Sequence, residues 1–345
     1  MRRVGGVAAL GLALGAGLLG GAAAAALGRR WILRGRVVLV TGGSRGLGLA
    51  IARRLVHEGA CVAICARDRD TLERARLELE RDGGNVLAVP CDVSDRAAVS
   101  AMVNQVSQQL GPIDAVVNNA GTIVVGPVDA MSIDDFRKAL DTNFWGPLHV
   151  TLAVLPQMRA RRAGRIVNVA SIGRKISVPH LLPYSASKFA LVGLSEGLRA
   201  ELRDDGVLVS TICPGLMRTG SPRHAWFKGR HREEYAWFSV SDSLPGLSMA
   251  AERAARQVVQ ALRWGRAERV LSLPAKVGAT VQALAPGATS EILALIDRWL
   301  PAAHEPTTLN ATKGEASTSE WSPSWLTRLG DDAARRHNQM ADSPG

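Results

Sequence analysis

Residues 36–48, which read RVVLVTGGSRGLG, decide the fold of this 345-residue chain. The apolar, β-branched run at 36–40 is typical of a buried parallel strand. The glycines that follow let backbone N–H groups and the start of a helix approach a pyrophosphate. A glycine pattern alone is weak evidence. The preceding strand and the helix-like residues Leu49 to Glu58 after it together predict a dinucleotide-binding turn.

A second strand-like run, Cys61 to Ala66, ends where dinucleotide folds select their cofactor. An acid at this place accepts the ribose hydroxyls of NAD, whereas a cation pairs with the 2′-phosphate of NADP. Arg67 is a cation and Arg45 lies in the glycine turn, so the sequence favours NADP over NAD. Two observations keep other interpretations open: Asp68 follows at once, and Arg67 could simply begin the charged helix at 68–81.

Strand-like runs and helical patterns alternate along the next part of the chain. The strands are expected at 86–90, 113–117 and 165–169, and the helices at 95–110 and 132–158. This alternation predicts right-handed crossovers and an α/β fold, a Rossmann-like doubly wound parallel sheet in a single domain. Ligands bind such sheets at the carboxyl ends of the strands, and Ser171 follows the strand at 165–169.

Two asparagine motifs need an explanation. Asn118-Asn119-Ala120-Gly121 closes the fourth strand, and its amides and small residues suit close approach of backbone to a flat ligand, although an Asn-rich turn would be unremarkable. Asn143 lies inside a predicted helix, where asparagine is mildly unfavourable. We therefore expect it to make either a structural polar contact or a functional one.

Tyr184 and Lys188 are four residues apart, so on a helix they share one face. A phenol with a pKa near ~10 is a poor acid or base at neutral pH, and a neighbouring cation lowers that pKa. The spacing alone is equally typical of an aromatic ring packed under a lysine stem. Whether the pair is catalytic depends on the rest of the chain.

Taken in order, these motifs resemble the short-chain dehydrogenase/reductases over roughly residues 35 to 220. The matching positions are Thr41-Gly42-x-x-x-Gly46-x-Gly48, Asn118 to Gly121, Asn143, Ser171, Tyr184-x-x-x-Lys188 and Pro214-Gly215. Each motif is modest alone, and the ordered set is a strong joint signal. The resemblance implies that Tyr184 and Lys188 belong to an active site rather than to a packed helix face.

The resemblance also implies a cofactor site. Its glycines line the pyrophosphate turn, Asp92 and Val93 lie near the adenine, and 118–121 lie beside the adenosine ribose. Pro214, Gly215 and Thr219 flank the nicotinamide. The full expected set is Gly42, Ser44, Arg45, Gly46, Leu47, Gly48, Arg67, Asp92, Val93, Asn119, Ala120, Gly121, Tyr184, Lys188, Pro214, Gly215 and Thr219.

Four residues are implied to be catalytic. Tyr184 exchanges a proton with the substrate oxygen while hydride moves to or from the nicotinamide. Lys188 lowers the tyrosine pKa and holds the nicotinamide ribose, and Ser171 hydrogen-bonds the substrate oxygen. Asn143 fixes a water that links Lys188 to solvent. Carbonyl reduction builds negative charge on oxygen, so two hydroxyl donors and a cation there stabilise the transition state.

The predicted function is therefore an NADP-dependent oxidoreductase that interconverts a carbonyl and a secondary alcohol on a small, lipophilic molecule. Two alternatives stay open. One is an NADP-binding regulatory or scaffold protein without turnover, which has no chemical need of Ser171, Tyr184 and Lys188. The other is an epimerase or dehydratase on the same scaffold.

The distribution of charge and the spacing of the cysteines argue against a nucleic-acid-binding or metal-binding protein. The net charge of +11 suggests nucleic-acid binding, but residues 1–36 hold six arginines and no acid, and beyond them the charges are mixed as on a solvated surface. We expect no nucleic-acid partner. The four cysteines have neither C-x-x-C spacing nor histidines at metal-ligand intervals, so no metal is expected.

The N-terminal segment is expected to associate with a membrane. Residues 4–28 hold no charge and are long enough to cross a ~30 Å hydrocarbon core as a helix. A cleaved signal peptide and a glycine-rich soluble helix are the alternatives. We favour an uncleaved single-pass anchor at 1–34. The greater number of arginines after it places the catalytic domain on the cytoplasmic side.

The C-terminal half is less informative. The catalytic domain is expected at 35–275, a helical extension at 276–300 interrupted at Pro286-Gly287, and a mostly disordered tail at 301–345. The extension could pack on the core, lie on a membrane, or build a homo-oligomer. Five aromatic residues suggest a lid over a lipophilic substrate, the packing of an extra helix, or a partner surface: Trp226, Phe227, Tyr235, Trp237 and Phe238.

Overall fold

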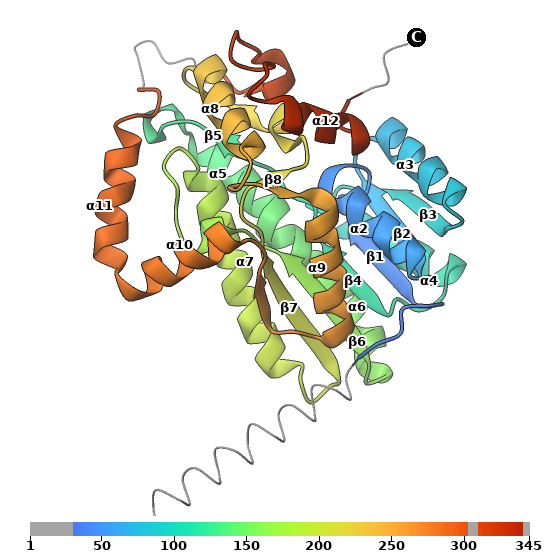
Figure 1. Cartoon of the computed structure of the whole chain (residues 1–345). Coiled ribbons are helices and arrows are strands. Elements are labelled where there is room, and N and C mark those ends of the chain that lie inside the picture. The colour runs from blue at the N-terminus through green and yellow to red at the C-terminus, as the bar shows by residue number, and fades with distance from the viewer. Residues whose placement is uncertain (1–29, 303–309, 341–345) are drawn as a thin grey trace, which may run out of the picture.

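A parallel sheet of seven strands forms the centre of the computed structural model, which describes residues 30–302 and 310–340 (Figure 1). The spatial order is β11-β7-β6-β4-β1-β2-β3. The strands are β1 (Val37–Thr41), β2 (Cys61–Ala66), β3 (Asn85–Pro90), β4 (Ala115–Asn118), β6 (Gly164–Val169), β7 (Val207–Cys213) and β11 (Glu268–Val270). The predicted doubly wound parallel sheet is confirmed.

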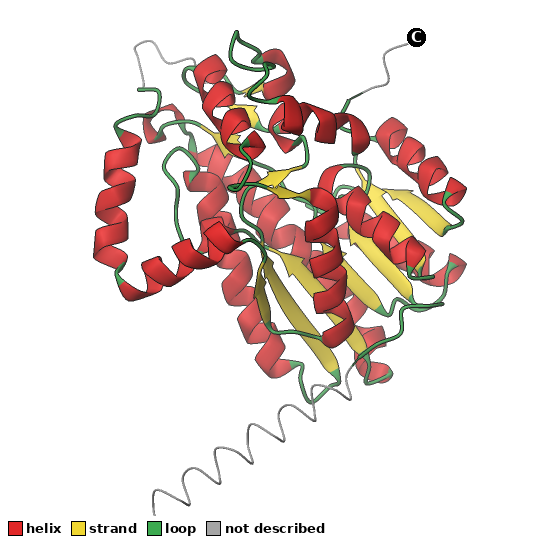
Figure 2. Cartoon of the chain, viewed as in Figure 1, coloured by secondary structure: helices red, strands yellow, loops and turns green. Residues whose placement is uncertain are grey.

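Helices cover both faces of this sheet (Figure 2). One layer is formed by α2 (Gly46–His57), α3 (Arg69–Arg81) and α9 (Ala251–Trp264), and the other by α4 (Arg96–Gln109), α6 (Gly146–Ala160) and α7 (Leu182–Glu201). Burial on both faces explains why the central strands are continuously apolar rather than alternating. The five residues of β1, for example, are all buried.

The sheet has its topological switch point between β1 and β4, which are hydrogen-bonded neighbours. From β1 the chain builds β2 and β3 on one side, and β4 begins the other side. The loops that leave β1 and β4 therefore diverge to opposite faces and open a crevice at the carboxyl ends of the strands. The glycine turn and the Asn118 to Gly121 motif both lie at this edge.

Two parts of the core differ from the sequence prediction. Strand β7, with the sequence VLVSTIC, was not among the predicted strands. The single helix expected at 132–158 is instead α5 (Ile133–Leu140), a π-helical turn at Asp141–Trp145, and α6. Single π-helical turns inside α-helices are frequent at functional sites. This one contains Asn143, whose side chain is fully buried.

The predicted disorder of the tail is wrong for residues 310–340. These residues form β12 (Thr312–Lys313) and α12 (Arg328–Arg336) and pack on the catalytic domain. The smaller elements beneath them are β5 (Val124–Val125), β8 (Met217–Arg218), β9 (Trp226–Phe227), α8 (His231–Ser243) and β10 (Met249–Ala250). Composition did not reveal this fold because the buried residues of this segment are mostly small or polar, such as Ala333, Ala334, His337 and Gln339.

The expected helical extension is present as α10 (Leu273–Leu284) and α11 (Pro286–Asp297), which break at the predicted Pro-Gly. Figure 1 shows the two helices as an arm beside the main body. Several of their apolar side chains face solvent, including Leu273 at 74% and Leu284 at 81% exposure, as does Trp299 just after α11 at 89%. Their role in oligomerisation or membrane contact stays a prediction.

The predicted membrane anchor falls mainly on residues 1–29, outside the described residues, and stays a prediction together with its orientation. Within 30–302 and 310–340, none of the helices is both long and apolar enough to span a bilayer.

The aromatic residues after position 225 form a packed cluster. Phe227, Tyr235 and Phe238 are buried, with Phe227 edge-on to both other rings at centroid distances of 5.4 and 6.0 Å. The Trp237 indole N–H donates to Glu234 Oε2 at 2.7 Å. These contacts support packing of α8 rather than an exposed lid. Of the five aromatic residues, Trp226 lines the cavity at the carboxyl ends of the central strands, which is described below.

Candidate active site

A cavity of about 420 Å³ lies at the carboxyl ends of β1, β4 and β6. It brings together residues that are up to 297 positions apart in the sequence, from Gly42 to Gln339, and among them are Ser171, Tyr184 and Lys188. Fifteen further predicted or neighbouring residues share its wall: Ser44, Arg45, Gly46, Leu47, Arg67, Asp68, Asp92, Val93, Asn119, Ala120, Gly121, Thr122, Pro214, Gly215 and Thr219. Gly48 and Asn143, also predicted, lie behind this wall.

The glycines of the turn are required by its backbone. Gly42 and Gly46 have φ values of +62° and +57°, in the left-handed region that disfavours side chains. A Cβ on Gly48 would lie 2.0 Å from the Gly42 carbonyl oxygen, and one on Gly42 would lie 2.9 Å from Ala120 Cα. The turn is thus a cradle with bare backbone at the start of α2, as a pyrophosphate requires.

The asparagine motif clamps this cradle to β4. The Thr41 hydroxyl accepts hydrogen bonds from the N–H groups of Asn119 and Ala120, at 3.0 and 3.1 Å. The Asn119 side-chain amide donates to the carbonyls of Thr41 and Gly42, both at 3.1 Å. The amide of Asn118 donates to Asn168 Oδ1 at 2.8 Å. Both asparagine side chains therefore build the wall of the crevice.

Tyr184 and Ser171 meet above this cradle. The Tyr184 hydroxyl and the Ser171 side chain share a hydrogen bond, and Ser171 Oγ also accepts from the Gly173 N–H at 3.0 Å. Burial raises the pKa of Tyr184 to about 12, against the lowering effect of Ser171. The expected lowering of this pKa by Lys188 is not seen: the groups that shift it besides burial are Ser171, Asp242 and Cys213. The phenol stays protonated at neutral pH.

Lys188 lies on the same face of α7, with its Nζ 5.7 Å from the centre of the Tyr184 ring. The ammonium donates to the Val169 carbonyl at 2.9 Å, and the Lys188 side chain is buried. Burial lowers the pKa of Lys188 to about 8, because the charged form loses hydration. Its charge is therefore present at neutral pH and is lost just above it.

Asn143 is held from three sides. Its amide donates to the Thr122 carbonyl at 3.0 Å and to Ser187 Oγ at 2.9 Å, and its Oδ1 accepts from the Thr122 N–H at 2.9 Å. A Cβ on Gly121 would lie 3.0 Å from Asn143 Oδ1 and 3.7 Å from Lys188 Nζ, so the two polar groups border the same small space. The water link expected between them stays a prediction.

The far end of the cavity holds the residues expected to choose the cofactor. Arg67 is 66% exposed in its side chain and lies 3.9 Å from the Asp92 carboxylate. Burial lowers the pKa of the nearby Arg45. Asp68 is engaged as the N-cap of α3, where Oδ1 accepts from the Thr71 N–H and hydroxyl, both at 2.8 Å. These bonds lower the pKa of Asp68.

Sequence reasoning missed several residues at this site. Asp242 on α8 is buried, accepts a hydrogen bond from the Met217 N–H, and raises the pKa of Tyr184. Burial raises the pKa of Asp242 itself to about 7. His224, Lys313 and Gln339 line the cavity. No sequence motif marks these positions, since their nearness to the glycine turn is created by the fold.

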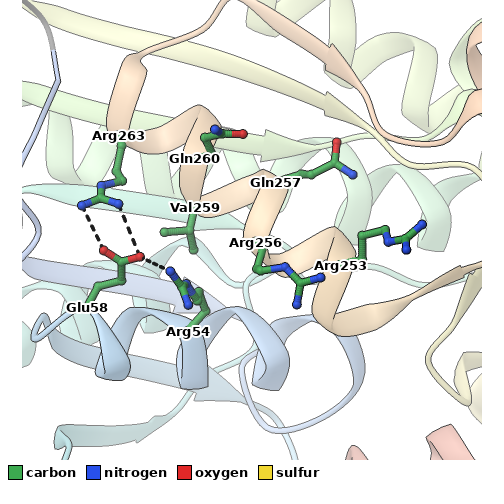
Figure 3. Close-up of a pocket in the computed structure, with 8 residues that line it drawn as sticks. All are labelled: Arg54, Glu58, Arg253, Arg256, Gln257, Val259, Gln260 and Arg263. Atoms are coloured by element: carbon green, nitrogen blue, oxygen red, sulfur yellow. Dashed lines mark hydrogen bonds and ion pairs between the residues drawn. The ribbon is translucent and has the colours of Figure 1, made fainter.

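The described parts of the chain offer no alternative metal-dependent site. Within 30–302 and 310–340 there is no cluster of three or more His, Cys, Asp or Glu side chains placed to hold a metal ion. A second pocket lies between α2 and α9, where the Glu58 carboxylate faces the guanidinium groups of Arg54 and Arg263 (Figure 3). Its eight lining residues include no nucleophile and no unpaired acid, so the chemistry belongs to the first cavity.

Comparisons with known proteins agree with this geometry. Residues 36–226 match the family model described as short chain dehydrogenase. The chain is 39% identical over 185 residues to the ketoacyl reductase HetN of Nostoc sp., covering 54% of this chain and 64% of that protein. It is 37% identical over 187 residues to 3-dehydrosphinganine reductase of Danio rerio, covering 53% and 56%. The chain thus spans less than two thirds of either relative.

A solved structure of an actinorhodin polyketide ketoreductase variant with NADPH is also similar. It aligns with a TM-score of 0.62 and 33% sequence identity, over 69% of this chain and 95% of that chain.

Proposed function

Because the chain belongs to the short chain dehydrogenase family, we propose that it is an NADP-dependent reductase of a carbonyl on a lipophilic molecule. The observation that carries this proposal is the convergence of Tyr184, Ser171 and Lys188 beside the glycine cradle in one cavity. The bare backbone at Gly42, Gly46 and Gly48 fits a dinucleotide-binding turn, since side chains there would collide with Ala120, Gln339 and the Gly42 carbonyl and prevent this close packing. An NADP-binding scaffold without turnover has no chemical need of Tyr184, Ser171 and Lys188 together in this cavity.

The site's own residues stabilise charge on the substrate oxygen. Tyr184 donates its proton to that oxygen as the carbonyl is reduced, and Ser171 holds the tyrosine hydroxyl and the substrate together. Lys188 supplies a buried positive charge on the same side. NADPH, when bound, supplies the hydride. Because groups fixed in a buried cavity need no reorganisation, they stabilise the transition state more than the ground state.

The Tyr184 phenol is in the protonation state that carbonyl reduction requires of a proton donor. A phenol with a pKa of about 12 is fully protonated at pH 7, and the protonated form is the proton donor. The lining of the same cavity includes the apolar residues Ile123, Ala225 and Trp226 among polar ones. This surface supports a substrate that carries an alkyl or acyl chain beside its carbonyl, as the names of the two reductase relatives also suggest.

The test of this proposal is NADPH oxidation by the full chain with a panel of 3-ketoacyl thioesters and long-chain ketones. We expect consumption of NADPH that depends on the added carbonyl, and formation of the matching secondary alcohol. A protein that binds NADPH but turns over no member of the panel would favour the scaffold alternative.

NADP preference is proposed to depend on Arg67. The exposed guanidinium is free to move from Asp92 to a 2′-phosphate, whereas the Asp68 carboxylate is committed to capping α3. A charge-assisted bond to phosphate contributes about 1.5–3 kcal/mol, and an acid in its place adds repulsion. We therefore expect Arg67→Asp to move the ratio of kcat/KM for NADPH over NADH by about 10²-fold toward NADH.

Arg81→Asp, at the exposed far end of α3, is the charge-matched control and should leave the ratio unchanged. Initial rates with both cofactors at one ionic strength give the measurement. An unchanged ratio in the Arg67 variant would assign the phosphate to Arg45 instead.

A further inference from the structure

The chain end at residues 310–340, termed here the C-terminal strap, closes over the mouth of the cofactor cavity. Its first strand, β12, pairs antiparallel with β9, and Lys313 from this strand lines the cavity. Its helix, α12, docks so closely that a Cβ on Gly220 would lie 2.5 Å from Ala334 Cβ. Figure 1 shows α12 in dark red between α8 and α3, above the ends of the central strands.

The end of the strap is bonded directly to the glycine turn. The Gly46 N–H donates to the His337 carbonyl at 2.9 Å. The Asn338 side-chain amide donates to the Ser44 carbonyl at 2.8 Å and to the Thr71 carbonyl at 2.9 Å. The strap therefore fixes the turn from the side opposite to the Asn119 clamp. The Leu49 N–H donates to the Arg45 carbonyl at 3.2 Å. The N–H groups of Leu47 and Gly48 have no acceptor inside the helix and are left for a ligand.

Gln339 is the strap residue that enters the cavity. It is 6% exposed, and its Nε2 donates to the Thr219 carbonyl at 3.0 Å. The same nitrogen would lie 2.7 Å from a Cβ on Gly46, so this side chain contacts the bare face of the turn. His224 Nε2 lies 3.1 Å from the Gln339 carbonyl and holds its backbone in place.

The second amide atom of Gln339 is unsatisfied. Gln339 Oε1 is buried and has no hydrogen-bond partner within residues 30–302 and 310–340. Buried polar atoms are almost always paired, and leaving one unpaired carries a free-energy cost. The other amide atom, Nε2, is the one held against Gly46 and the Thr219 carbonyl, and Gln339 lines the cavity, so a small shift of the side chain brings Oε1 to a donor on a ligand bound there.

We propose that Gln339 is a cofactor-contacting residue and that the C-terminal strap completes the nicotinamide half of the dinucleotide site. In this arrangement Gln339 Oε1 accepts a hydrogen bond from an O–H of the nicotinamide ribose or from the carboxamide N–H, and its Nε2 stays on Thr219. The inference rests on the proposed function, because it requires that the cavity bind NADP. It adds a contact from a part of the chain that lies beyond the matched family region, 36–226.

The test compares the dissociation constants of NADP⁺ for the full chain and for Gln339→Leu. Leucine keeps most of the volume and removes the acceptor. Gln109→Leu, at the exposed end of α4, is the matched control. Isothermal titration calorimetry should show about tenfold weaker binding to Gln339→Leu, as for loss of one buried hydrogen bond, and no change in the control.

A second ligand distinguishes the two donors. The 3-acetylpyridine analogue of NADP⁺ has a methyl group in place of the carboxamide NH₂. If the variant loses affinity for NADP⁺ alone, Gln339 accepts from the carboxamide. An equal loss for both ligands assigns the ribose hydroxyl, and either result supports the proposal.

Unchanged binding in Gln339→Leu would overturn the proposal, as would tighter binding, which would make the strap a competitor of the cofactor. Hydrogen exchange on the unmodified chain gives an independent measurement: peptides covering 331–340 should gain protection with NADP⁺, and a loss of protection would contradict the inference. If the unmodified chain itself does not bind NADP⁺, the proposed function fails. If it binds and the variant matches it, only the strap proposal fails.

Discussion

Tyr184→Phe should lower kcat for NADPH-dependent carbonyl reduction by about 10³-fold or more, and should leave the dissociation constant of NADPH within a few-fold. The substitution removes the one hydroxyl that can donate a proton to the substrate oxygen, and proton transfer by a positioned group contributes about 10² to 10⁴ in rate. The hydrogen bond to Ser171 is lost as well, so Ser171 loses the partner that orients it. Single-turnover rates with saturating NADPH give the measurement.

The chain offers a matched control because it contains only two tyrosines. Tyr235 lies buried in the cluster with Phe227 and Phe238, away from the main cavity. Tyr235→Phe keeps that packing and should retain nearly full activity. If Tyr184→Phe and Tyr235→Phe gave similar rates, Tyr184 could not be the proton donor.

Lys188→Met should lower kcat/KM for NADPH by about 10²-fold at pH 7 and change its pH dependence. The substitution removes a buried charge next to the developing oxyanion, an effect of the size seen when one preorganised electrostatic donor is deleted. The pH profile of kcat/KM for NADPH reports groups of the free enzyme. In the unmodified protein it should fall as the pH rises through about 8, the pKa of Lys188.

The fall of kcat/KM with rising pH follows from the protonation state of Lys188 that is active. The protonated ammonium is required, and it is lost above its pKa, so activity declines on the alkaline side. The Tyr184 phenol, with a pKa of about 12, remains protonated throughout this range and does not produce the decline. Lys138→Met, on the exposed face of α5, is the control and should keep the full profile. A decline near pH 8 that persisted in Lys188→Met would show that another group is responsible.

The parts of the site that the sequence predicted are those specified by local patterns. Gly42, Gly46 and Gly48 are needed because of the backbone of one turn, and the apolar strand before them is needed because it is buried on both faces. Tyr184 and Lys188 meet because they are four residues apart on one helix. Such features depend on neighbours in the sequence, and so a single sequence is enough to predict them.

The parts that were missed depend on tertiary structure. Asp242 raises the pKa of Tyr184 although 58 positions separate them, and Gln339 contacts Gly46 from the other end of the chain. The expected lowering of the Tyr184 pKa failed for the same reason. Spacing shows that a cation is near, but only the structure shows that burial and Asp242 raise this pKa. The strap was predicted to be disordered because its polar composition does not reveal that residues such as His337 and Gln339 are buried against the domain.

The central claim is that this cavity transfers hydride to a carbonyl, and its most direct test uses NADPH labelled with deuterium at C4 of the nicotinamide. Each of the two stereospecifically labelled forms is incubated with the full chain and a medium-chain 3-ketoacyl thioester, and the alcohol is analysed by mass spectrometry. We expect one labelled form, and not the other, to place a single deuterium on the carbinol carbon. Binding of both forms with no deuterium in any product would contradict the account.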